Sequence, residues 1–191
     1  MRFAKITAKF GNFVRPKSRT SQSMGRWASF LYNLYFKNMN QLFESKNIIW
    51  IKNVNTPTGD AYMNLTDDSF RLYFPRQHRT NAASPLLGEI ILLFQKINQK
   101  RVFTHLVRFI DNGPVRIEAN RPMHEFYRDV KIVAMTPLEN LIYVSNTKWN
   151  DVNFQGISQG NACKIKNISG IENIYDKLVN DVLENFSKYL R

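Results

Sequence analysis

The chain has 191 residues, a formal net charge of +12 at neutral pH, a hydrophobic content of 43% and an aromatic content of 13%. This apolar content excludes a globally disordered chain, because such chains lack the hydrophobic surface that offsets the entropy of ordering. The single cysteine, Cys163, excludes an intramolecular disulfide framework and a multi-cysteine zinc site, and no apolar run is long enough to predict a membrane-spanning helix.

The positive charge is concentrated in the N-terminal part of the chain. No acidic residue precedes Glu44, whereas residues 1–40 contain the basic residues Arg2, Lys5, Lys9, Arg15, Lys17, Arg19, Arg26 and Lys37. We interpret residues 1–22 as a basic tail and residues 23–191 as a single α+β domain. Because a block of one charge sign repels itself, the tail is expected to stay extended until an anionic surface neutralises it.

Three interpretations of the tail are open. It is an arm that contacts nucleic-acid phosphates, an organelle-targeting leader, or a solvated extension of a basic protein. The expected localisation is cytoplasmic, or organellar if the tail is a leader. The arm would use the basic side chains of Lys5, Lys9, Arg15, Lys17 and Arg19.

Hydrophobic spacing predicts the first elements of the domain. Apolar residues recur every three or four positions between Trp27 and Leu42, which is typical of one face of an amphipathic helix over about 24–44. The β-branched run at 48–51 predicts a strand that ends in a turn. A second strand is expected over 70–74, and a polar loop is expected over 76–84.

The strongest pattern lies between residues 88 and 110. An apolar run at 90–94, a turn at 98–100 and an alternating segment at 102–110 predict a β-hairpin whose first strand is buried on both faces. The second strand is expected to place the following side chains on one face: Phe103, His105, Val107 and Phe109.

The remaining elements are further strands and a terminal helix. Strands are expected near 115–118, 128–135 and 140–145. Ser169 and Glu172 have the spacing of a capping box, which predicts a helix behind them. The apolar face of that helix would contain Ile174, Leu178, Val182 and Phe186.

The strand lengths and turns predict the fold class. Short strands joined by short turns cannot all be parallel, because a parallel crossover needs about a dozen residues or more. The predicted class is therefore α+β, with a mostly antiparallel curved sheet or small barrel flanked by an N-terminal and a C-terminal helix.

The segment SPLLGEIILLF at 84–94, followed by FTHLVRF at 103–109, resembles the middle of the PUA-like superfamily, which includes the EVE, YTH and ASCH domains. The resemblance covers about 47–155, with 49–51 in the position of the first strand, and it does not include the helix at 24–44. It implies a domain that binds RNA or DNA, often with a modified or flipped base in an aromatic pocket.

A flipped base needs flat aromatic faces for stacking and polar groups for its edge. The base-pocket candidates are Trp50, Asn53, Trp149 and Phe154. Trp149 lies in a polar segment between Lys148 and Asn150, which are further candidate contacts. The alternative role of both tryptophans is core packing, in which Trp149 anchors a loop and Trp50 belongs to an apolar strand.

A basic segment around Tyr73 and Phe74 is the second candidate contact surface. Arginine donates to phosphate oxygens and stacks on bases, and neighbouring aromatic rings suit unstacked nucleotides. The alternative is a solvated basic loop. The candidate contacts here are Arg71, Arg76, His78 and Arg79.

Signals for catalysis are weak. The histidines are too far apart in sequence for a helical metal-binding pair, and the chain lacks a glycine-rich phosphate loop, so we expect no metal and no cofactor. The one catalytic alternative is a Mg²⁺-dependent nuclease of the PD-(D/E)xK kind, with Asp111, Asp129 and Lys131. An acid-x-Lys pattern is expected by chance in a chain of this composition.

The sequence therefore predicts a nucleic-acid-binding domain that uses a basic arm and a basic-aromatic surface, with RNA or DNA as its partner. A structural protein of a ribonucleoprotein particle, such as a ribosome, is the second interpretation. The nuclease is the third.

Overall fold

The computed structural model describes residues 44–57, 61–112, 115–118 and 126–191. The tail, its candidate phosphate contacts at 5–19 and the predicted helix at 24–44 lie outside these residues, except for Glu44 at the helix end. Phe43–Arg191 forms one compact unit by its internal contacts.

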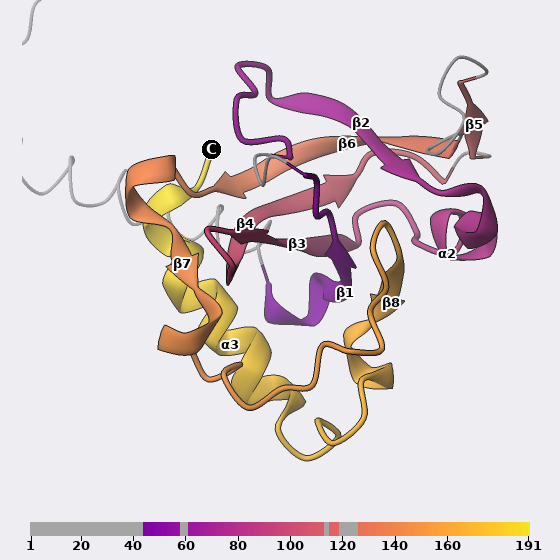
Figure 1. Cartoon of the computed structure of the whole chain (residues 1–191). Helices are drawn as coiled ribbons and strands as arrows, with labels where there is room; N and C mark the ends of the chain where they lie inside the picture. The colour runs from indigo at the N-terminus through magenta and orange to yellow at the C-terminus, as the bar shows by residue number, and fades with distance from the viewer. Residues whose placement is uncertain (1–43, 58–60, 113–114, 119–125) are drawn as a thin grey trace, which may run out of the picture. The chain divides into compact units, whose positions relative to one another are not determined.

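The described residues form one eight-stranded sheet with two α-helices (Figure 1). The bounds are β1 Ile48–Asn53, β2 Ser69–Phe74, β3 Ile90–Ile97, β4 Lys100–Phe109, β5 Arg116–Ile117, β6 Phe126–Met135, β7 Ile142–Tyr143, β8 Ala162–Lys164, α2 Arg79–Ala83 and α3 Tyr175–Phe186.

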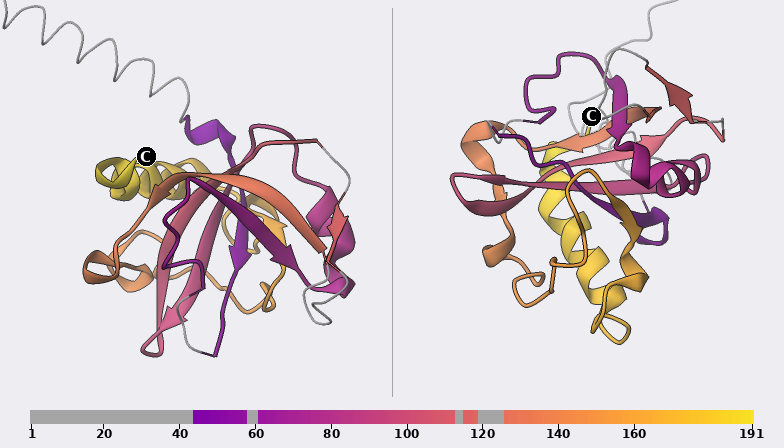
Figure 2. Two further views of the ribbon diagram at one scale, coloured as in Figure 1. Left: turned by 90° about the horizontal axis from the view of Figure 1, so that it is seen from above. Right: turned by 45° about the vertical axis from the view of Figure 1, so that its right-hand side comes forward.

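The sheet is mixed and mostly antiparallel. Its main strand order is β2-β6-β4-β3-β1-β8, with β5 paired to β6 and β7 paired to β4. The β1–β3 pair is parallel, and the other strand pairs are antiparallel. The sheet curls strongly into a half-barrel, as the two views in Figure 2 show. The predicted α+β class with a mostly antiparallel curved sheet is confirmed.

The β3–β4 hairpin forms as predicted, except that one side chain lies on the other face of the sheet. Asn98 (φ 49°) and Gln99 (φ 64°) make its tight turn in the left-handed conformation that such turns require. The β3–β4 register shifts where Leu93 meets Phe94, so the alternation along β4 is interrupted. Phe103 therefore packs on the opposite face of the sheet from Val107, and the prediction of one shared face is wrong for Phe103.

Hydrophobic side chains cover both faces of the sheet. On one face, Leu178 and Val182 of α3 pack against residues such as Ile90 and Leu92 of β3. On the other face, Phe74 of β2 belongs to a second cluster with residues of β1, β3, β4 and β6. The whole run 90–94 is buried, which confirms the prediction that this strand is covered on both sides. No helix among the described residues is long and apolar enough to cross a membrane.

Three local predictions are corrected by the structure. The expected loop at 76–84 contains a 3-10 turn, Arg76–His78, and the helix α2. The capping box is absent, because Gly170 turns the chain with φ +85° and α3 begins only at Tyr175. Ile174 is consequently exposed instead of lying on the buried helix face. Strand β8 was not predicted, since its three residues lie between polar segments.

Candidate functional site

A cleft of about 250 Å³ opens where β1 ends, beside β2. Its walls are formed by residues 52–57, residues 61–62, Tyr73 and residues 159–160. These segments are distant in sequence and meet because the sheet curls: Lys52 of β1 lies 4.1 Å from the centre of the Phe74 ring of β2. The cleft therefore lies at the opening of the half-barrel.

Two tyrosines supply aromatic surface to the cleft. Tyr62 has φ +62°, an uncommon conformation for an aromatic residue, and its hydroxyl oxygen accepts a hydrogen bond from the Tyr73 amide at 3.2 Å. The Tyr62 ring lies 4.6 Å from that of Phe70, and the Tyr73 hydroxyl donates to Glu118 at 2.6 Å. Both rings are half-buried and held by neighbours, so they offer preorganised stacking surface.

Polar groups of the cleft come from β1 and from the segment 157–161. The Asn53 side chain donates to the Ile157 carbonyl at 3.2 Å and accepts from the Asn55 amide at 3.1 Å. Gln159 donates to the Asn55 carbonyl at 2.8 Å. Asn53, a predicted base-pocket residue, therefore lines the cleft, where it ties segment 157–161 to β1.

Lys52 is the unusual group of the cleft. Its side chain is only 1% exposed, and its ammonium donates to the Gly160 carbonyl. Burial disfavours the charged form, so the pKa of Lys52 lies well below its usual value. Sequence reasoning missed this residue, although a lysine after the apolar run at 48–51 was a visible signal.

Two residues of the predicted basic segment contact neighbours of the cleft residues without lining the cleft themselves. Arg71 forms an ion pair with Glu118 at 3.6 Å, and the same carboxylate accepts from the Tyr73 hydroxyl. His78 lies 3.3 Å from the Ser158 hydroxyl, and both burial and the charge of Lys52 lower the pKa of His78.

The other two predicted residues of this segment are arginines. Arg76 and Arg79 are exposed, and Arg79 lies over the Phe126 ring at 5.6 Å. None of the four basic residues lines the cleft: Arg71 shares Glu118 with the cleft residue Tyr73, and His78 lies beside Ser158, next to the cleft residue Gln159.

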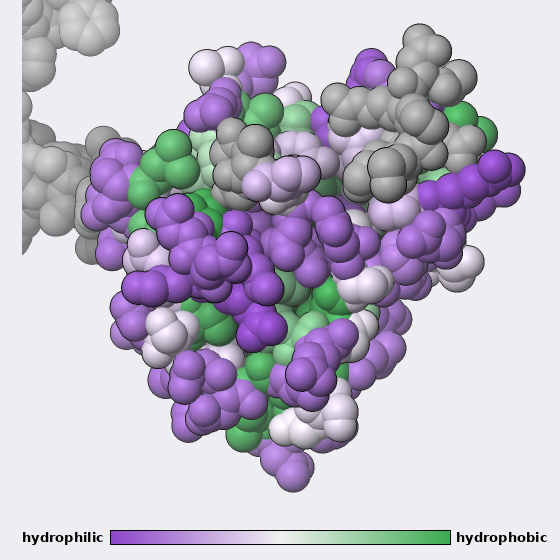
Figure 3. Space-filling model, in the orientation of Figure 1, coloured by the Kyte–Doolittle hydropathy of each residue, from purple (hydrophilic) through white to green (hydrophobic). Residues whose placement is uncertain are grey.

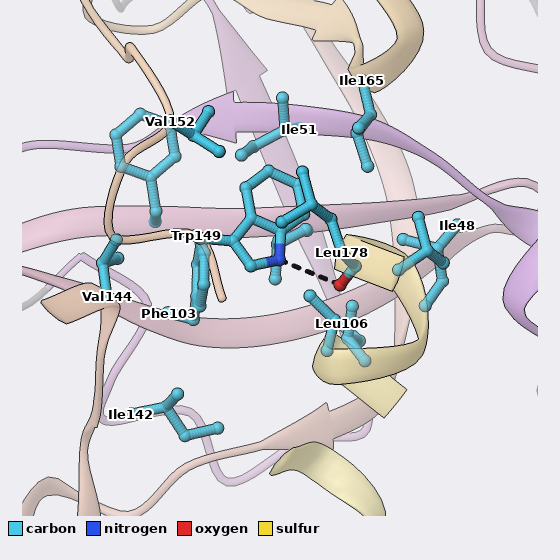
Figure 4. Close-up of a cluster of buried hydrophobic side chains, with 14 of the residues drawn as sticks. Ile48, Ile51, Phe103, Leu106, Ile142, Val144, Trp149, Val152, Ile165 and Leu178 are labelled. Carbon is cyan, nitrogen blue, oxygen red and sulfur yellow. Dashed lines mark hydrogen bonds between the residues drawn. The ribbon is translucent and has the colours of Figure 1, made fainter. Parts of the chain in front are cut away.

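The other base-pocket candidates are in the core. Trp149 is completely buried, and its indole nitrogen donates to the Leu178 carbonyl at 2.9 Å (Figure 4). Phe154 is 4% exposed and packs against Phe94, and Trp50 is 3% exposed and donates to Glu89 at 2.7 Å. None of these three rings lines the cleft or offers a face to a base.

Lys148 and Asn150, on either side of Trp149, are exposed. The backbone amide of Lys148 donates to Asp181 at 3.1 Å. Their side chains lie apart from the cleft, since neither residue lines it.

The candidate nuclease carboxylates are held by arginines. Asp111 accepts from Arg128 at 2.9 Å and lies 4.0 Å from Arg116, which also pairs with Asp129. Lys131 is exposed on β6. The structure thus brings Asp111 and Asp129 together, but as partners of guanidinium groups. Within the described ranges, no three His, Cys, Asp or Glu residues form a group suited to a metal ion.

Comparisons with known proteins assign no family to the chain. No family model matches it, and no curated protein does. Among solved structures, a hypothetical protein from Leishmania major is similar to it with a TM-score of 0.42 and 10% sequence identity, over 74% of this chain and 99% of that one.

Proposed function

We propose that this protein binds nucleic acid through unpaired or flipped nucleotides and that the cleft receives one unstacked base. The proposal rests on one observation. A single cleft of small volume contains polar groups and two tyrosines whose rings are fixed by contacts with neighbouring residues. Drug-sized ligands occupy pockets of about 300–1,000 Å³, so a cleft of about 250 Å³ suits a smaller ring system such as a base. Unpaired bases are commonly held by aromatic stacking.

The charge of the protein supports the same proposal. A formal charge of +12 favours polyanionic partners, and Arg71, which shares Glu118 with the cleft residue Tyr73, supplies a guanidinium group beside the cleft. Figure 3 shows that hydrophilic side chains predominate on the face seen in Figure 1. Membership of the PUA-like superfamily, inferred from the segments 84–94 and 103–109, is part of this proposal.

Replacing the cleft tyrosines tests the site directly. Tyr62→Leu and Tyr73→Leu are each expected to weaken binding to short single-stranded oligonucleotides by about 1–3 kcal/mol, the usual value of one base–aromatic stack. Fluorescence anisotropy gives the affinity, and thermal melting monitors the fold. Tyr143→Leu is the matched control, because Tyr143 is also half-buried but lies on β7, away from the cleft. Folded variants that bind like the wild type would refute the proposal.

Deleting residues 1–22 tests the contribution of the tail. If the tail is an arm, the slope of log affinity against log salt should become shallower by about 0.7 for each single-strand phosphate that the shortened protein no longer neutralises. Binding should weaken alike for all base sequences, because phosphates carry no sequence information. Titrations at several salt concentrations measure the slope. An unchanged slope would show that the tail contacts no phosphate.

A further inference from the structure

Lys52 has too few partners for a buried structural lysine. An ammonium group has three N–H donors, and Lys52 makes one hydrogen bond, to the Gly160 carbonyl, in the described part of the chain. Among those residues no carboxylate pairs with it, and its ammonium lies over the face of the Phe74 ring, 4.1 Å from the ring centre. Burying an ammonium group with so little compensation is unfavourable, and an apolar side chain of similar length would be more stable there.

The position of Lys52 in the cleft offers a functional explanation for this unfavourable burial of an ammonium group. Lys52 lines the cleft whose walls carry Tyr62 and Tyr73, and Gly160, its hydrogen-bond acceptor, lines the same cleft. The edge of a base stacked on one of these tyrosine rings would face the polar groups that line the same cleft, including Lys52. Lys52 can therefore donate a further hydrogen bond to an acceptor on the base.

We propose that Lys52 selects the base in the cleft by donating to the O6 atom of guanine or the O4 atom of uracil or thymine, so that these bases bind better than adenine and cytosine, which have an amino group at that position. This inference rests on the proposed function. In its ammonium form Lys52 is a donor only, and the amino bases place a donor where the keto bases place an oxygen. A site that buries a donor rejects a ligand that leaves this donor unpaired.

The test uses strands in which abasic sugars surround a single base, so that stacking between bases and uncertainty of register are removed. At mildly acidic pH, which favours the ammonium form, guanine should bind about tenfold or more tightly than adenine, and thymine should exceed cytosine in the same way. Lys52→Met should bring both ratios close to one. Lys177→Met is the matched control, because it removes the same charge from the exposed face of α3 and should leave the ratios unchanged.

The outcomes separate this inference from the proposed function. Lys52→Met should melt at a higher temperature than the wild type, so that loss of the fold does not explain a loss of preference. If Tyr62→Leu weakens binding but Lys52→Met leaves the base ratios unchanged, the cleft binds bases and Lys52 does not select them. A wild-type preference for adenine or cytosine would overturn the inference in the same way. If Tyr62→Leu and Tyr73→Leu leave binding unchanged, the proposed function itself fails.

Discussion

Replacing Trp149 by alanine is expected to lower the free energy of unfolding by about 3–5 kcal/mol and to leave the nucleic-acid affinity of the folded protein unchanged. The indole ring has no exposed surface and lies edge-on to Phe103, with 5.5 Å between the ring centres. Its removal leaves a cavity between the sheet and α3, and it takes the donor away from the Leu178 carbonyl.

Thermal or denaturant unfolding and oligonucleotide binding, measured on the same sample, test this expectation. Lys148→Ala is the matched control, because this exposed neighbour should change the free energy of unfolding by less than about 0.5 kcal/mol. The opposite result, a loss of affinity in a variant that melts like the wild type, would place Trp149 at the binding surface and contradict its burial in the core.

Local sequence pattern predicted most of the strands. The β-branched run at 48–51 became β1, and the hairpin at 90–110 became β3 and β4, because periodicity and turn residues act over short distances. The parallel β1–β3 pair and the short strand β8 depend on partners far along the chain, so no local pattern indicated them. The capping-box spacing at 169–172 was misleading, since Gly170 directs the chain into a turn before the helix starts.

Local sequence also predicted the candidate site only in part, because it does not show contacts with residues far along the chain. Trp149 has polar neighbours in sequence, and its apolar surroundings come from β1, β4 and α3, so its burial was not visible locally. Asn53 was a predicted contact and does line the cleft, whereas none of the four predicted basic residues over 71–79 lines it. Tyr62 and Gln159 meet Lys52 only through the curl of the sheet, and this tertiary arrangement cannot be read from spacing.

Replacing Asp111 by alanine is expected to destabilise the fold by about 3 kcal/mol, because the charge of Arg128 would lose its carboxylate. The Arg128 side chain is completely buried, and it also donates to the carbonyls of Ala82 at 3.0 Å and Pro85 at 3.2 Å. It therefore joins β6 to α2 and to the segment that leads into β3. Asp111 is 25% exposed, so water can reach the position that its side chain vacates. We therefore expect a loss in the free energy of unfolding at the low end of the range for a broken buried ion pair.

Asp129→Ala is the matched control for Asp111→Ala. It removes the same type of charge, but its partner Arg116 is half-exposed, so the expected loss is below about 1 kcal/mol. Arg128→Met combined with Asp111→Ala should recover part of the stability lost in Asp111→Ala, because no buried charge is then left unpaired. Denaturant unfolding of the wild type, Asp111→Ala, Arg128→Met and the double variant gives the coupling energy, and Asp129→Ala is measured beside them. Equal small losses for Asp111→Ala and Asp129→Ala would show that Asp111 does not neutralise Arg128, and its carboxylate would then be available for other chemistry at this edge of the sheet.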